Sequence, residues 1–183
     1  MRALLLWGLL AGTAVAQALK PGPPDIVAIE TRDMRVEFAG DRAWTMYRIL
    51  HKGAVVADKV GLYGTVFAAE GGKWIGTGHN EGGIEKVEQV ELKVDGKPLE
   101  FTNGVVHRGS RGVIEKKSTI GPLRLAATYI VTDDALLERH RYEVMEDVTI
   151  GTLYAFMHPW VPATTEWLAQ LPDGALVEGG FDQ

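Results

Sequence analysis

A segment near the C-terminal end of the chain combines a histidine with aromatic residues. Residues 154–160 read YAFMHPW, and strand alternation places His158 on the same side as the two aromatic residues that precede it. Pro159 should end the strand because proline has no N–H to donate to a ladder. An imidazole suits proton transfer near neutral pH, and an indole offers an apolar face for a sugar ring. We therefore expect His158 to be a catalytic group for proton transfer beside a substrate-binding Trp160. The alternative is a histidine that only hydrogen bonds a carbonyl while the indole packs in the core.

A glycine-rich segment at residues 76–83 reads GTGHNEGG. Glycines let the backbone adopt positive φ and approach a ligand closely. The three polar residues between them, His79, Asn80 and Glu81, could act as acid, hydrogen-bond partner and base. The alternative is a glycine-rich turn whose polar side chains have no function. A phosphate-binding loop is not predicted, because no Gly-Lys-Ser/Thr ending and no helix signal follow.

Residues 138–143, which read ERHRYE, form a third candidate. On a strand, Arg139 and Arg141 face one way while His140 and Tyr142 face the other. Two arginines spaced in this way could clamp a carboxylate or a sulfate, whereas the alternative is a solvated sheet face with cross-strand ion pairs.

Residue His107, in a charged turn, is a further candidate for a binding cleft. The histidine spacings match no zinc motif, so no metal site is predicted. The absence of cysteine excludes disulfides and thiolate chemistry, and no cofactor is expected. A formal net charge of −5 argues against nucleic-acid binding, which normally requires a basic surface.

The N-terminus has the three-part pattern of a secretory signal peptide. Arg2 precedes an apolar run at residues 3–10, and small residues follow at Ala14 and Ala16. The apolar run is shorter than the roughly 20 residues of a membrane span. We expect a signal peptide over residues 1–16, with an uncleaved anchor as the alternative. Cleavage would release a periplasmic or extracellular protein without a membrane span.

The rest of the chain is predicted to be a Pro-rich linker over residues 17–24 and one β domain over residues 25–183. Apolar and polar residues alternate over residues 34–38 and 90–94, and Asp95-Gly96 is a hairpin signal. Three long strands are expected at residues 123–131, 135–145 and 149–158, with one helix-like piece at residues 165–171.

Short connections between these runs favour an all-β, antiparallel β-sandwich. A further apolar run begins at residues 175–177, close to the last residue. We therefore expect the sandwich to be incomplete at its C-terminal end.

Residues 123–162 resemble the aldose 1-epimerase (galactose mutarotase) superfamily. The resemblance lies in two predicted strands joined by a two-acid turn, followed by a third that ends in His158-Pro159-Trp160. In that family the segment ends in a His-Pro-Tyr-Phe-like motif. The resemblance implies a supersandwich fold with a sugar-binding cleft, and it implies that His158 protonates the ring oxygen of a hemiacetal. The family's base is a glutamate far downstream, and Glu166 and Glu178 are the glutamates that follow His158 here.

Two kinds of function therefore remain open for the exported domain. One is a sugar-active enzyme, either an epimerase-like isomerase or a protein related to the polysaccharide lyases that share this fold. The other is a non-catalytic glycan-binding or structural domain of the cell envelope, because a fold alone does not fix a function.

Overall fold

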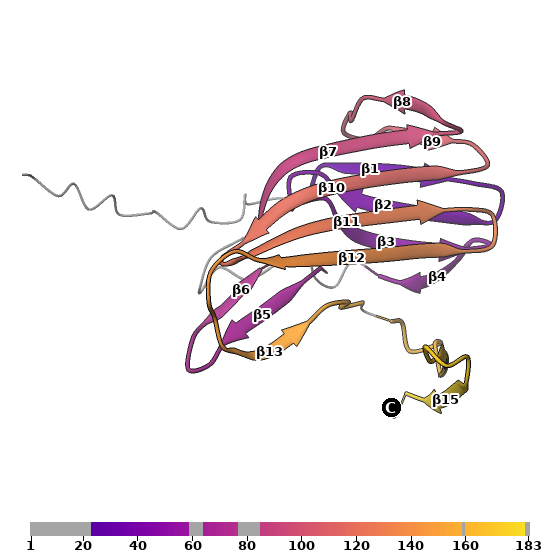
Figure 1. Ribbon diagram of the computed structural model, residues 1–183. Coiled ribbons are helices and arrows are strands. Elements are labelled where there is room, and N and C mark those ends of the chain that lie inside the picture. Colours follow the sequence, from indigo (N-terminus) through magenta and orange to yellow (C-terminus); the bar gives the residue numbers. More distant parts are fainter. Residues whose placement is uncertain (1–22, 59–63, 77–84, 159, 182–183) are drawn as a thin grey trace, which may run out of the picture.

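The computed structural model describes residues 23–58, 64–76, 85–158 and 160–181 (Figure 1). These residues form fifteen strands and no helix, which confirms the predicted all-β class. No helix in this part of the chain is long and apolar enough to cross a membrane. The predicted signal peptide, and all but two residues of the predicted linker, lie outside the described residues.

The first large sheet contains five strands in the order β4-β3-β2-β1-β9. All neighbours are antiparallel except β1 and β9, which run parallel. The apolar residues of β2 that were predicted to face the core, Met34, Val36 and Phe38, are buried, but Glu37, which was predicted on the polar face, is buried as well. The strand bounds are β1 (Ile26–Glu30), β2 (Met34–Ala39), β3 (Thr45–His51), β4 (Ala54–Ala57) and β9 (Val106–Arg108).

The second large sheet is antiparallel, in the order β12-β11-β10-β7-β8. Asp95 and Gly96 connect β7 to β8 with φ values of 49° and 77°, so the predicted hairpin turn is confirmed. The strand bounds are β7 (Lys86–Val94), β8 (Lys97–Leu99), β10 (Gly112–Ile120), β11 (Leu123–Val131) and β12 (Leu136–Val144).

The two sheets pack face to face as a β-sandwich (Figure 1). Phe38 of β2 and Tyr129 of β11 meet edge to face across the core, with ring centroids 5.5 Å apart. Gly112 of β10 permits close approach of the sheets, because a Cβ at that position would collide with the side chain of Ile29. The buried apolar residues of both sheets form one continuous core.

A buried ion pair lies at the second sheet, and its lysine also reaches the connection between β2 and β3 of the first sheet. The Lys116 ammonium lies 2.8 Å from the Glu85 carboxylate and donates to the Ala43 carbonyl, also at 2.8 Å. Ser118 donates a 2.5 Å hydrogen bond to the same carboxylate. The lysine and glutamate side chains are at most 1% exposed, so each charge depends on the other for compensation.

A smaller antiparallel sheet has the order β13-β5-β6 and is formed by β5 (Val66–Ala69), β6 (Trp74–Gly76) and β13 (Ile150–Tyr154). The strand predicted over residues 149–158 is therefore shorter than expected. His158 lies in the irregular segment that follows β13, and the prediction that it ends a strand is wrong.

The C-terminal described residues form an antiparallel hairpin of β14 (Glu166–Gln170) and β15 (Leu176–Gly180). The helix-like piece expected at residues 165–171 is therefore wrong. The turn sequence Pro172-Asp173-Gly174 connects β14 to β15 and lets them pair in register. This pairing overrides the weak local preference of β14 for a helix.

Candidate functional site

One carboxylate lies between two imidazoles at the inner face of β12. Glu138 Oε2 is 2.9 Å from Nε2 of His158, and its Oε1 is 2.8 Å from Nε2 of His140. The side chain of Glu138 is 10% exposed, that of His158 is 15% exposed and that of His140 is 1% exposed. We call Glu138, His140 and His158 the imidazole–carboxylate cluster. It has the residue types needed for acid–base chemistry, at contact distance.

Strand alternation places two members of the cluster on the same face of β12. Glu138 and His140 are two residues apart, and they pair across the strands with Tyr129 and Ala127 of β11. The small Ala127 leaves room for the imidazole beside it. The Phe156 ring stacks on this imidazole with a centroid separation of 4.7 Å, and it fixes the segment that carries His158 against β12.

The other side of His140 meets a chain of hydroxyl groups. Its Nδ1 lies 3.0 Å from the Tyr142 hydroxyl and 3.1 Å from the Ala155 carbonyl, and the Thr65 hydroxyl is 2.6 Å from that of Tyr142. Gly76 adopts a φ of 129° and packs directly on the Thr65 backbone, where a Cβ would collide with the carbonyl oxygen. The hydroxyl chain is therefore held by β5, β6 and β12 together.

Opposing effects act on the pKa of Glu138. Burial alone would raise this pKa, but hydrogen bonds and positive charge from His140 and His158 outweigh burial and hold the pKa below its usual value. The carboxylate is therefore ionised at neutral pH and can only accept hydrogen bonds. Because the carboxylate cannot donate, Nε2 of His158 must carry the proton in their shared hydrogen bond.

The tyrosines next to the cluster stay protonated at neutral pH. Burial raises the pKa of Tyr129 well above its usual value, and the charge of Glu138 adds to this effect. Burial also raises the pKa of Tyr142, against a lowering contribution from its hydrogen bond to Thr65. The Tyr142 hydroxyl therefore keeps its proton and can donate it in a hydrogen bond.

The second nitrogen of His158 is available for chemistry. Within the described part of the chain, Nδ1 of this ring has no hydrogen-bond partner. The Trp160 indole meets the same ring edge to face at a centroid distance of 5.4 Å. Trp160 is 43% exposed beside this imidazole, and Phe156, which stacks on His140, is 53% exposed. A bridge between Ala57 and Trp160 holds the indole at the end of β4.

The remaining predicted site residues do not join this cluster. Arg139 and Arg141 lie exposed on the outer face of β12, opposite Glu138 and His140. His107 lies in β9 of the other sheet, paired in register with Ile29. The glycine-rich candidates His79, Asn80 and Glu81 lie outside the described residues.

Sequence reasoning missed Glu138 and His140 as partners of His158. Their spacing places Glu138 and His140 on one face of a strand, but it carries no signal that this face meets His158. Among the described residues, no group of three or more His, Asp or Glu side chains has the geometry to hold a metal ion.

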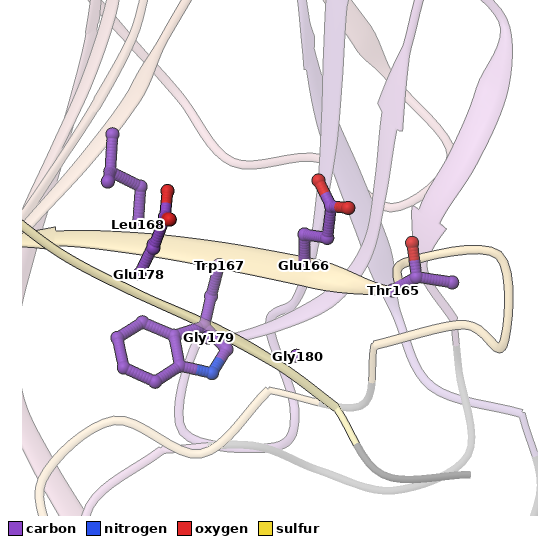
Figure 2. A pocket seen from close by; sticks show the side chains of 7 residues that line it. All are labelled: Thr165, Glu166, Trp167, Leu168, Glu178, Gly179 and Gly180. Carbon is purple, nitrogen blue, oxygen red and sulfur yellow. The ribbon is translucent and has the colours of Figure 1, made fainter.

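A hollow with a volume of about 850 Å³ lies elsewhere, along the β14–β15 hairpin. Figure 2 shows the Trp167 indole on the opposite side of the hairpin from Glu166 and Leu168. The hollow therefore follows both faces of an exposed ribbon, and it lacks the convergent polar groups of a binding site. Neither His158 nor Trp160 lines it. We place the candidate site at the imidazole–carboxylate cluster because its groups contact one another.

Comparison of the chain with protein-family models, with curated proteins and with solved structures found no match. No relative therefore supplies a role for any residue of the cluster, and the roles follow from its geometry.

Proposed function

We propose that this chain is an exported carbohydrate-active protein of mutarotase-like fold, in which His158 exchanges protons with a bound sugar. The observation that carries the proposal is a largely buried, ionised Glu138 that holds a partly exposed imidazole beside the exposed Trp160. This arrangement provides a proton-transfer group and a stacking surface at one place on the molecule.

The proposed chemistry is the opening and closing of a cyclic hemiacetal. Protonated His158 donates the proton on Nδ1 to the ring oxygen while the bond between that oxygen and the anomeric carbon breaks. The anomeric hydroxyl loses its proton to water, and an open-chain aldehyde results. As the ring closes on either face of the aldehyde, the attacking hydroxyl gives its proton to the imidazole, and the solvent returns a proton to the former carbonyl oxygen. A positioned acid or base of this kind contributes roughly 10²–10⁴-fold to a rate.

Within this mechanism Glu138 is a positioning residue. It fixes a proton on Nε2 of His158 and directs Nδ1 outward. The Glu–His pair thus matches the general arrangement in which a buried carboxylate orients an imidazole.

Sugar recognition is assigned to the exposed aromatic surfaces. Trp160 and Phe156 can stack on the apolar C–H face of a pyranose. Their exposure also favours the second candidate function, a glycan-binding domain without turnover, since stacking requires no proton transfer.

The test is anomer interconversion, measured by NMR exchange spectroscopy on a panel of aldoses with the mature protein. We expect H158Q to slow the catalysed rate at least 100-fold, and E138Q to slow it less. H51Q, which removes an imidazole from β3, serves as the matched control and should retain the full rate. A rate that is equal in H158Q and wild type would refute the catalytic assignment.

A glycan-array measurement on the same proteins separates the two candidate functions. Saturable binding that W160A abolishes, without turnover by the wild type, would support the glycan-binding domain. The absence of both turnover and binding would refute any carbohydrate function.

A further inference from the structure

The outer face of the second sheet carries three cationic side chains that form no close ion pair with the described carboxylates, although the charge of Lys117 contributes to lowering the pKa of Glu91. They are Lys117 of β10 and Arg139 and Arg141 of β12, and all three are exposed. None has a carboxylate oxygen within 4.0 Å among the residues that the structure describes. Other cations on this face are paired, because Lys93 contacts Glu91 and Glu115 at 3.1 Å.

Strand register brings the three cations around one spot. Ala126 of β11 pairs with Lys117 on one side and with Arg141 on the other. Arg139 lies two residues along β12 and pairs with Thr128. With neighbouring strands about 4.8 Å apart, the two cations flanking Ala126 have Cα atoms about 10 Å apart. This separation suits an anion or a sugar unit lying between them.

Small side chains form a floor between the cations. Ala126 and Thr128 lie between Lys117 and the two arginines. They also line a hollow of about 220 Å³ that extends over β10 to β7, where Glu91, Glu115 and Lys117 border it and neither arginine does. The longer side chains of β10 and β12 stand on either side of this floor. We name the set Lys117, Ala126, Thr128, Arg139 and Arg141 the cationic trough.

We propose that the cationic trough is a second binding site, which takes an acidic glycan through the carboxylate or sulfate groups on its sugars. Guanidinium groups bind such anions in a bidentate manner, and unpaired arginines lose no existing ion pair on binding. The Thr128 hydroxyl and the polar rim of the hollow, which includes Gln89, can hydrogen bond the sugar hydroxyls.

The trough is independent of the imidazole–carboxylate cluster. Arg139 and Arg141 alternate along β12 with Glu138 and His140, so the two sets face opposite sides of one sheet. The whole chain has a net charge of −5, so a polyanion should be repelled unless it meets a local cationic site.

The test uses the mature protein and four probes in binding titrations: polygalacturonate for carboxylate, heparin for sulfate, dextran as a neutral glycan, and sodium sulfate as a free anion. We expect saturable binding of polygalacturonate or heparin, and none of dextran. Affinity should fall roughly tenfold in K117A and in R141A, because each removes one charge-assisted contact. K97A on β8 removes one positive charge outside the trough, and its affinity should match the wild type.

Three results would overturn the proposal. The first is the absence of binding to either acidic glycan at low salt. The second is an equal loss of affinity in K97A and R141A, which would indicate unspecific charge attraction. The third is competition by sodium sulfate at the same concentration as the glycan's own sulfate groups, which would identify a simple anion site without sugar recognition.

Discussion

Replacing Glu138 with glutamine removes the charge that holds the imidazole–carboxylate cluster together and changes little in shape. A hydrogen bond to a charged group contributes about 1.5–3 kcal/mol and a neutral one about 0.5–1.5 kcal/mol. Glu138 shares one hydrogen bond, with His158, and lies 2.8 Å from Nε2 of His140 without hydrogen-bond geometry, so the substitution loses about 1–2 kcal/mol. Relief from burying a charge offsets part of this loss, which leaves about 1 kcal/mol. For a domain of this size, that loss lowers Tm by about 2–4 °C at pH 7.

Thermal unfolding followed by circular dichroism measures this difference, and its pH dependence tests the cause. The pKa of Glu138 in the folded protein lies below the ordinary 4.5. Its contribution to stability is therefore complete above pH 4.5 and is lost as the pH falls through the folded-state pKa. The gap between wild type and E138Q should shrink in that acidic range.

A matched control lies on the same strand. E143Q removes an exposed carboxylate that is paired with Arg124, and it should change stability by less than about 1 kcal/mol. An E138Q protein as stable as the wild type at pH 7 would refute the reasoning, as would a gap that does not change on acidification.

Three further substitutions test the fold by urea denaturation. K116M should cost about 3–5 kcal/mol because it leaves Glu85 buried without its cation, and combining it with E85Q should recover part of that loss. G112A should cost about 1–3 kcal/mol, since the added Cβ meets the side chain of Ile29, and a neutral effect would show that the sheets can separate there. Y142F should cost about 1–3 kcal/mol through loss of its hydroxyl bonds, and unchanged stability would mean that the hydroxyl chain contributes nothing.

The alternation of apolar and polar residues predicted the strands because successive side chains of a strand point to opposite faces, and one face is buried. A strand was predicted over residues 123–131, and β11 has those bounds. A hairpin turn was predicted at Asp95-Gly96, and it connects β7 to β8. The same reasoning failed at residues 165–171, because the pairing of β14 with β15 depends on a partner strand and not on the local sequence.

The candidate site was only partly predictable. His158 and Trp160 stand near each other in sequence, so their contact follows from local geometry. The carboxylate of Glu138 comes from β12, 20 residues before His158 in the chain. The register that brings it to His158 is set by the packing of residues 155–158 on β12. No spacing rule within one segment could supply that contact.

The central claim is that a sugar binds where the imidazole of His158 and the indole of Trp160 meet. Long-range ¹H–¹⁵N spectra of the histidine rings and the indole N–H groups, recorded while an aldose is titrated into the mature protein, test it directly. We predict that the signals of His158 and Trp160 shift together and saturate, while those of His51 do not move. Unchanged signals from both residues across the aldose panel would contradict the claim.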